Sequence, residues 1–275
     1  MLNQFLFDRI CRRIKDLKIQ GATNVAKAAL QAYFMFPSKE SKRTLLSLRP
    51  TEPMLSHVLE LAEKSIPQED ILAHFSEAQD EINKLAFSLI KNNSRIFTHC
   101  HSTNVIKALI YAKNHGKRFE VYNTETRPLF QGRITSRELS SANIKVTQFV
   151  DSASELAIAK QGKKDREYAD MVFLGADALL NDSVINKVGS GMISEIAYGH
   201  KVPVYIIADS WKYSHKSVKL EQRHFKEVWN PEKNKIHVEN PAFEAIKPKY
   251  IKAIISELGM MSYRSFLNKA KKRKY

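Results

Sequence analysis

Hydrophobic residues in the first third of the chain recur with the helical period. The clearest case is a stripe with alternating steps of four and three residues, formed by Ile71, Phe75, Ala78, Ile82, Leu85 and Leu89. This spacing places all of them on one face of an amphipathic helix. A second stripe, Ile10, Ile14 and Leu17, predicts a first helix, and Pro37, Pro50, Pro53 and Pro67 mark helix starts or stops. We therefore expect a helical N-terminal domain at residues 1–92.

From about residue 95 the pattern changes to short β-rich runs with helical stretches between them. The expected strands are residues 95–98, 119–123, 145–150, 171–174 and 202–208, and the helical stretches are residues 103–113, 136–142 and 192–199. Such alternation forms right-handed crossovers and a parallel sheet. The predicted fold is thus α/β, with the helical N-terminal domain followed by a Rossmann-like parallel-sheet domain at residues 93–275.

Composition restricts the class of protein. Of 275 residues, 43% are hydrophobic, which is enough for a core, and no apolar run approaches the ~20 residues of a membrane-spanning helix. Asp8, Arg9 and further arginines interrupt the N-terminal segment, so no export signal is expected. Two cysteines, Cys11 and Cys100, cannot make a disulfide framework, which predicts a reducing, cytoplasmic setting.

The charge of the chain is strongly positive and leaves its partner open. Lysines and arginines number 44 against 29 acidic residues, a net charge of +15 that attracts anions. A phosphorylated small molecule, a nucleic acid and a lysine-rich surface without a specific partner are the alternatives. Nucleic acid is disfavoured because no nucleic-acid motif is recognisable. The basic run at residues 269–275 is expected to be a solvated, frayed end.

Polar residues collect where the predicted parallel strands end, which is where such sheets bind ligands. Cys100 follows the first strand, within residues 98–104, just before a helix begins. Backbone N–H groups at a helix start favour a thiolate and also favour bound anions. The alternative is a small buried cysteine beside Ser102 or Thr103 as the N-cap. A zinc site with the adjacent histidines is not favoured, because neighbouring residues point in different directions.

Asp177 lies just beyond the apolar strand at residues 171–174, so we expect it to emerge partly buried. A carboxyl group in that setting has a raised pKa and acts as an acid or base near neutral pH, the alternative being an Asx turn or a cap. Asn186 and Lys187 precede a glycine-containing loop that suits a phosphate, although the order is not that of a Walker loop. Lys212, which by itself is an ordinary solvated lysine, follows the last strand.

These segments resemble, in the same order along nearly the whole chain, a known superfamily. It is shared by ribose-1,5-bisphosphate isomerase, methylthioribose-1-phosphate isomerase and the alpha, beta and delta regulatory subunits of initiation factor 2B. The matching segments are Ile19-Gln20-Gly21-Ala22, Leu48-Arg49-Pro50-Thr51, Thr98-His99-Cys100-His101-Ser102, Glu125-Thr126-Arg127-Pro128 with Gln131-Gly132, Val150-Asp151-Ser152-Ala153, Gly175-Ala176-Asp177, Asn186-Lys187-Val188-Gly189 and Asp209-Ser210-Trp211-Lys212-Tyr213.

The resemblance implies an aldose–ketose isomerase of a phosphorylated pentose that needs neither metal nor nucleotide cofactor. In the isomerase branches, the residues matching Cys100 and Asp177 are the catalytic pair. Cys100 would move a proton at the sugar carbon while Asp177 exchanges a proton with the neighbouring oxygen, through an enediol-type intermediate. The implied substrate-binding residues are Gln20, Gly21, Ala22, Thr23, Arg49, Ser102, Thr103, Asn104, Asn186, Lys187 and Lys212. A homodimer or higher homo-oligomer through the α/β domain is implied as well.

Two features bear on the branch. The regulatory subunits commonly lack the cysteine or alter the aspartate, whereas this chain keeps both, which favours an enzyme. Among the isomerases, its Cys-His-Ser and Gly-Ala-Asp-Ala segments look closer to the ribose-1,5-bisphosphate branch. That branch typically has Arg-Gly-Ala-Gly in its first loop, but this chain has Gln20-Gly21-Ala22-Thr23. Without the arginine, a bidentate phosphate contact is lost. The alternative is therefore a non-catalytic subunit, similar to those of initiation factor 2B, that binds a nucleotide or sugar phosphate.

Overall fold

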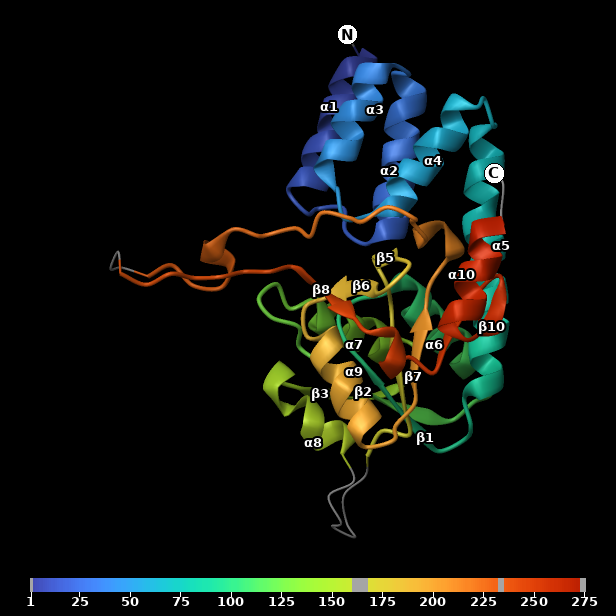
Figure 1. Cartoon of the computed structure of the whole chain (residues 1–275), viewed down its shortest axis with the longest axis vertical. Helices are drawn as coiled ribbons and strands as arrows, with labels where there is room; N and C mark the ends of the chain where they lie inside the picture. The colour runs from blue at the N-terminus through green and yellow to red at the C-terminus, as the bar shows by residue number, and fades with distance from the viewer. Residues whose placement is uncertain (1, 160–167, 232–234, 273–275) are drawn as a thin grey trace.

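The first part of the chain folds as helices, as its apolar stripes predict. In the computed structural model, which describes residues 2–159, 168–231 and 235–272, these helices form the upper lobe of Figure 1. They are α1 (Leu2–Lys15), α2 (Ala22–Met35), α3 (Lys39–Leu48), α4 (Pro53–Glu63) and α5 (Gln68–Leu89). Their inward faces share one apolar core that includes Ile14, Leu30 and Leu59.

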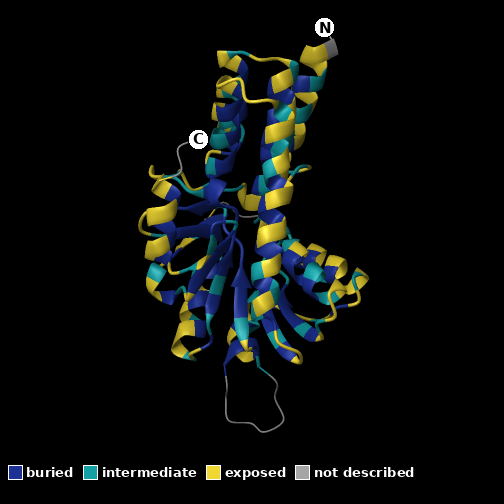
Figure 2. Ribbon diagram, turned by 90° about the vertical axis from the view of Figure 1, so that its right-hand side faces the viewer, coloured by how far each residue is buried: buried dark blue, intermediate teal, exposed yellow. Residues whose placement is uncertain are grey.

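Helix α5 belongs to both halves of the molecule. Its stripe is confirmed: Ile71 and Phe75 lie in the core of the helical lobe, while Ile82 and Ala86 pack in the core beneath the sheet. Figure 2 shows this long helix running from the helical lobe down along the sheet, with its exposed face outward. The division of the chain at residue 92 stays a prediction, since α5 is a structural part of both lobes.

The second part of the chain is built on a seven-stranded sheet in the order β10-β9-β7-β4-β1-β2-β3. All five strands expected from the sequence are present, as β1 (Ser94–Thr98), β2 (Phe119–Thr124), β3 (Lys145–Phe149), β4 (Met171–Leu174) and β7 (Val204–Ile207). They pair in parallel, as predicted. The expected crossover helices are α6 (Thr103–Asn114), α7 (Gln131–Ser141) and α9 (Ser190–Gly199), and a short α8 (Ser154–Ile158) joins them.

Several short elements were not expected from the sequence. The large sheet also contains β9 (Ala253–Ser256) and, antiparallel to it, β10 (Gly259–Met261). A small antiparallel sheet consists of β5 (Ala178–Leu179), β6 (Val184–Lys187) and β8 (Phe243–Ile246). Short 3-10 turns lie at η1 (Asp151–Ala153), η2 (Ser210–Lys212), η3 (Phe225–Glu227) and η4 (Pro248–Tyr250). Asn186 and Lys187, which precede the glycine-containing segment, end β6, where pairing with β8 holds them.

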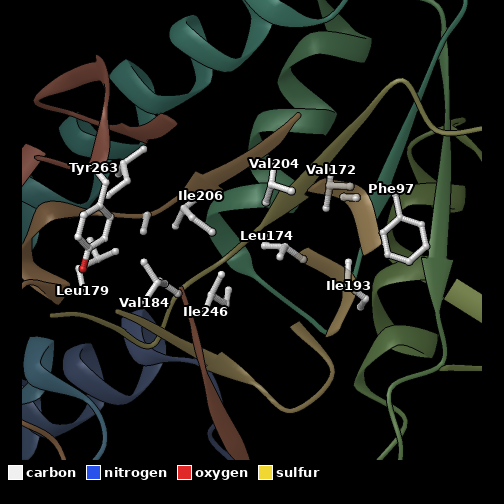
Figure 3. Close-up of a cluster of buried hydrophobic side chains, with 14 of the residues drawn as sticks. Phe97, Val172, Leu174, Leu179, Val184, Ile193, Val204, Ile206, Ile246 and Tyr263 are labelled. Atoms are coloured by element: carbon white, nitrogen blue, oxygen red, sulfur yellow. The ribbon is translucent and has the colours of Figure 1, made fainter. Parts of the chain in front are cut away.

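Alternate residues of the central strands point into two different cores. Phe97 of β1 faces the small sheet and the helices α8, α9 and α10 (Tyr263–Lys272), whereas its neighbour Ile96 faces α5, α6 and α7. Figure 3 shows the first of these cores, in which Leu174 and Ile206 lie among side chains of the small sheet such as Ile246. The sheet is thus covered on both faces, which leaves the ends of its strands as the place for a ligand.

The basic C-terminal run is not simply a frayed end. Residues up to Lys272 form helix α10 (Tyr263–Lys272), in which Phe266 is fully buried and Ala270 is buried as well. Lys269 donates a hydrogen bond of 2.6 Å from its Nζ to the carbonyl of Leu258. The apolar face of the helix therefore orders most of the run, and residues 273–275 lie outside the described residues. None of the described helices is both long enough and apolar enough to cross a membrane.

Candidate active site

A cavity of about 330 Å³ lies at the carboxyl ends of the parallel strands. Every residue proposed from the sequence as catalytic or substrate-binding lines it: Cys100, Asp177, Gln20, Gly21, Ala22, Thr23, Arg49, Ser102, Thr103, Asn104, Asn186, Lys187 and Lys212. Both lobes contribute, since Gln20 to Thr23 come from the start of α2 and Arg49 ends α3. The cavity thus brings together segments that are up to about two hundred residues apart in the sequence.

Hydrogen bonds fix the backbone of Cys100, which follows the end of β1. Its φ of 69° lies in the left-handed region, and two threonine hydroxyls fix the peptide groups on either side of it. Thr126 Oγ1 accepts a hydrogen bond of 2.9 Å from the Cys100 N–H, and Thr135 Oγ1 donates one of 2.7 Å to the Cys100 carbonyl. Gly175 lies so close to Ser102 that a Cβ on it would be 2.4 Å from Ser102 Oγ. The loop after β1 is therefore fixed tightly against the loop after β4.

Of the two alternatives for Cys100, a thiolate at a helix start or a small buried cysteine, its surroundings favour the second. Burial raises the pKa of the thiol from 9.0 to about 12, and the charge of Lys187 lowers it only in part. The start of α6 does not reverse this, because desolvation of the anion outweighs the attraction of the helix end. Cys100 is thus a thiol at neutral pH, with Lys187 placed to stabilise its anion.

Asp177 emerges half-buried from the strand end, as predicted. Burial raises the pKa of its carboxyl group, and the charges of Lys212, Arg49 and Lys187 counteract the rise in that order. Within the described residues the carboxyl group makes no hydrogen bond, so it is available to a molecule in the cavity. This is the environment expected of a group that exchanges protons near neutral pH.

Lys212 is buried rather than solvated. Its Nζ donates hydrogen bonds to the carbonyl of Ala176, at 2.7 Å, and to Asn104 Oδ1, at 3.3 Å. Burial lowers the pKa of Lys212, whereas the carboxylates of Asp177, Asp209 and Glu52 raise it. Only a tertiary fold can enclose the ammonium in this way, because the residues that surround it come from both lobes.

Sequence reasoning did not find the acidic and basic side chains that surround Arg49. Arg49 Nη2 donates a 2.8 Å hydrogen bond to Glu52, whose carboxyl group has a pKa raised by burial to about 7. Arg49 Nε also lies 3.7 Å from Glu221, which in turn accepts a 3.0 Å hydrogen bond from Arg223 Nη1. Glu221 and Arg223 line the cavity but lie on an irregular segment, so no periodic signal could have identified them.

Gln131 and Gln20 are glutamines that line the cavity in different ways. Gln131 begins α7, and among the described residues its buried Oε1 has no hydrogen-bond partner. An unpaired acceptor at a cavity wall suits a hydroxyl group of a ligand. Gln20 Nε2 instead donates a 2.7 Å hydrogen bond to the carbonyl of Leu17. The Gln131-Gly132 segment was part of the family resemblance, which is the signal that could have identified Gln131.

The histidines beside Cys100 diverge from it. His99 pairs through Nδ1 with Thr124 Oγ1 and through Nε2 with the carbonyl of Val188, at 2.9 Å. His101 Nδ1 lies 3.1 Å from Thr135 Oγ1. The two imidazoles therefore bind different parts of the protein and do not converge with the sulfur on one point, in agreement with the argument against zinc.

One group of three possible metal ligands lies outside the cavity lining. Ligand atoms of His74, Asp209 and Glu257 are all within 4.8 Å of one another. Both Asp209 oxygens lie 3.1 Å from His74 Nε2, and Glu257 accepts hydrogen bonds from the N–H and hydroxyl of Ser210. His74 and Asp209 contact each other and Glu257 is hydrogen-bonded to Ser210, so each of the three side chains already has a partner in the protein.

Comparison with known proteins agrees with the geometry. The family model described as the initiation factor 2 subunit family matches residues 22–263. A ribose 1,5-bisphosphate isomerase of Methanocaldococcus jannaschii is 31% identical over 282 aligned positions, covering 90% of this chain and 89% of the relative.

Two solved structures show the same fold. A translation initiation factor 2B of Pyrococcus horikoshii has a TM-score of 0.79 at 24% identity and covers 93% of this chain and 96% of its own. A 5-methylthioribose 1-phosphate isomerase of the same organism has a TM-score of 0.76 at 21% identity, covering 96% of this chain and 87% of its own. At these identities the likeness establishes the architecture.

The first prediction concerns the thiol of Cys100. Since only the thiolate reacts, a pKa of about 12 instead of 9.0 lowers its reactivity at pH 8 about a thousandfold relative to an ordinary thiol. Methyl methanethiosulfonate labelling followed by peptide mass spectrometry measures the rate. Lys187→Met slows the reaction further, whereas Lys107→Met, on the exposed face of α6, leaves it unchanged. Rapid labelling of wild-type Cys100 at pH 8 would contradict the assignment.

The second prediction concerns the stability cost of Asp177. Its folded-state pKa is raised, so folding is penalised as pH rises above the unfolded value of 3.8. Asp177→Asn removes that penalty. We expect its free energy of unfolding to equal that of wild type below about pH 4 and to exceed it at pH 7. Urea titrations at both pH values test this, and equal stability at pH 7 would disprove it.

Proposed function

Because this chain belongs to the initiation factor 2 subunit family, we propose that it is an aldose–ketose isomerase of a phosphorylated pentose, with ribose 1,5-bisphosphate as the substrate and ribulose 1,5-bisphosphate as the product. The observation that carries the proposal is the meeting of Cys100 and Asp177 in one cation-lined cavity. The ribose 1,5-bisphosphate isomerase of M. jannaschii, which resembles almost the whole chain, supports this choice of substrate.

The reaction needs two proton transfers and no net change in electrons. Going from aldose to ketose, the phosphate stays on C1 while the bond between C1 and the ring oxygen O4 breaks and O4 gains a proton. The hydrogen of C2 leaves as a proton, C1 gains a proton, and the C2 hydroxyl loses its proton as the C2 carbonyl forms. Asp177, whose pKa is raised, exchanges the proton on oxygen. Cys100 acts at carbon, and the charge of Lys187 lowers the pKa of the thiol, which eases its ionisation.

The remaining lining residues suit a phosphorylated ligand. Lys187 and Lys212 provide ammonium groups, and Arg49 provides a guanidinium group already oriented by Glu52. Phosphate groups pair strongly with such cations, and helix starts add backbone N–H donors. The starts of α2 and α6 both contribute to the cavity wall through Thr23 and Thr103.

A non-catalytic role similar to that of initiation factor 2B is the second candidate. The observation in its favour is Gln20, which adds no charge to the first loop and whose amide group is turned back to the carbonyl of Leu17. A chain with this role would bind a nucleotide or sugar phosphate in the same cavity without converting it. Turnover separates the two candidates.

We also propose that the protein is a homodimer. The described part of the segment between η2 and β8 projects from the body of the molecule (Figure 1). Several apolar side chains of this segment are exposed. These include Phe225, Val228, Trp229 and Ile236, of which Trp229 is 54% exposed. Such a patch is typical of a protein interface, and a twofold pair of identical chains is the commonest arrangement. The free thiols of Cys11 and Cys100 support a cytoplasmic setting.

The third prediction tests the isomerase directly. Wild-type protein converts ribose 1,5-bisphosphate, and Cys100→Ser and Asp177→Asn each lose about 10²- to 10⁴-fold in kcat, since each removes an acid–base group. Methylthioribose 1-phosphate is assayed in parallel, and the sugar that is converted shows to which isomerase branch the protein belongs. Cys11→Ser is the control for loss of a thiol outside the cavity.

Calorimetry with the same sugars separates the outcomes of that assay. Binding without turnover by the wild type would favour the non-catalytic candidate. Full activity of Cys100→Ser would remove Cys100 from the mechanism.

The fourth prediction concerns assembly. Light scattering coupled to gel filtration gives wild type twice the chain mass of 31.5 kDa. Replacing Trp229 and Ile236 by aspartate places two charges in the proposed interface and yields the monomer mass with an unchanged helical circular dichroism signal. A wild-type protein that elutes as a monomer would refute the dimer.

A further inference from the structure

Helix α5 contains buried polar side chains on a face that is otherwise apolar. Gln79 is 5% exposed and Asn83 is 6% exposed, and one turn and a half before Gln79 lies His74, half-buried. None of the three lines the cavity. Burying polar groups is unfavourable unless they are hydrogen-bonded, so their partners indicate what they are for. Those partners lead to Lys212 by two separate routes.

The first route runs through the side chain of Asn104. Gln79 Oε1 accepts a 2.9 Å hydrogen bond from Asn104 Nδ2, and Gln79 Nε2 donates to the carbonyl of Asn104, at 3.3 Å, and to Asn83 Oδ1, at 2.7 Å. The amide of Gln79 therefore fixes which way the amide of Asn104 faces. Asn104 turns its oxygen to Lys212 Nζ, at 3.3 Å. The opposite orientation would present an NH₂ group to the ammonium.

The second route runs through the turn η2, on which Lys212 lies. His74 Nε2 lies 3.1 Å from both oxygens of Asp209, and its ring is stacked on the indole of Trp211 with centroids 3.5 Å apart and an interplanar angle of 8°. Asp209 Oδ1 also accepts a 2.8 Å hydrogen bond from the Trp211 N–H. His74 thus contacts two residues of a four-residue stretch, 209–212, that ends in Lys212.

We propose that His74 and Gln79 are positioning residues that orient the ammonium group of Lys212 in the cavity, although neither touches it. Both contacts come from helix α5. His74 holds the turn η2, and Gln79 orients Asn104, which is one of the two hydrogen-bond acceptors of the Lys212 ammonium group. The helical lobe thereby completes the active site. The inference rests on the proposed function, because it takes Lys212 to act on the substrate.

The consequence for the chemistry follows from the charges around Lys212. Asp177, Asp209 and Glu52 are the carboxyl groups that act on it, and all three raise its pKa against the effect of burial. Lys212 is also the strongest of the cations that lower the pKa of Asp177. A displaced or neutral Lys212 would therefore alter both substrate binding and the proton exchange at Asp177.

The experiment compares two substitutions of Gln79 whose side chains have nearly the same length as glutamine. Gln79→Met removes both hydrogen bonds to Asn104, while Gln79→Glu keeps an acceptor for Asn104 Nδ2. Ser41→Ala, which removes a buried hydroxyl at the start of α3, is the control for a general loss of stability. The readouts are kcat, KM and the rate of Lys212 acetylation by trace acetic anhydride as a function of pH, followed by mass spectrometry.

We expect Gln79→Met to lose about 10- to 100-fold in kcat/KM, because small misplacements of a binding group have effects of this size. Gln79→Glu recovers most of that loss, and Ser41→Ala changes only the melting temperature. Should Gln79→Met not fold, His74→Phe provides the second test. It keeps a ring that can stack on Trp211 but removes the contact with Asp209, so we expect a loss of kcat/KM and a midpoint of Lys212 acetylation at lower pH, because a carboxylate that raises the pKa of Lys212 is no longer held in place.

Failure of this inference and failure of the proposed function give different results. If Gln79→Met or His74→Phe left both the kinetics and the acetylation profile of Lys212 unchanged, the positioning role of that residue would be wrong, whatever happened to stability. If wild type showed no isomerase activity but the acetylation profile shifted as described, the proposed isomerase would be wrong and the positioning of Lys212 would hold.

Discussion

The electrostatic balance around Asp177 is the constraint on which the site depends. A carboxylate enclosed by protein is unfavourable unless cations compensate it, and here they are Lys212, Arg49 and Lys187. Each cation comes from a different part of the chain, so the compensation exists only in the folded molecule. The balance is incomplete, because burial still raises the pKa of Asp177. A carboxyl group with a raised pKa is suited to proton exchange, and burying its charge lowers the free energy of unfolding at neutral pH.

The architecture follows from the need to bring these charges together without exposing them to bulk water. The parallel sheet ends at the cavity with Cys100 and Asp177, while the small antiparallel sheet places Lys187 beside them. The helical lobe closes the other side with Arg49, and α5 joins the lobes through both cores. The cavity wall is therefore rigid on the side of the sheet and is fixed by a shared helix on the other.

The fold is shared with proteins described as isomerases and as translation factors. The cavity of this chain contains a thiol, a carboxyl group with a raised pKa and several cations, which are the groups that the proposed isomerase reaction uses. Gln20 is the departure, and its amide is hydrogen-bonded to its own loop. Fold alone does not decide between these activities, whereas the side chains of the site do.

Helices and strands with a clear pattern of hydrophobic residues could be predicted from the sequence. The stripe of α5 and the five parallel strands were predictable because hydrophobic periodicity depends on neighbouring residues. The short motifs predicted site residues that all line the cavity. Short strands such as β6 and β9 were missed, since pairing with distant partners creates them. Three further properties depend on the folded molecule: burial raises the pKa of the Cys100 thiol, Lys212 is buried, and Glu221 and Arg223 line the cavity. Burial and long-range contacts set these properties, and neither is encoded at a single position.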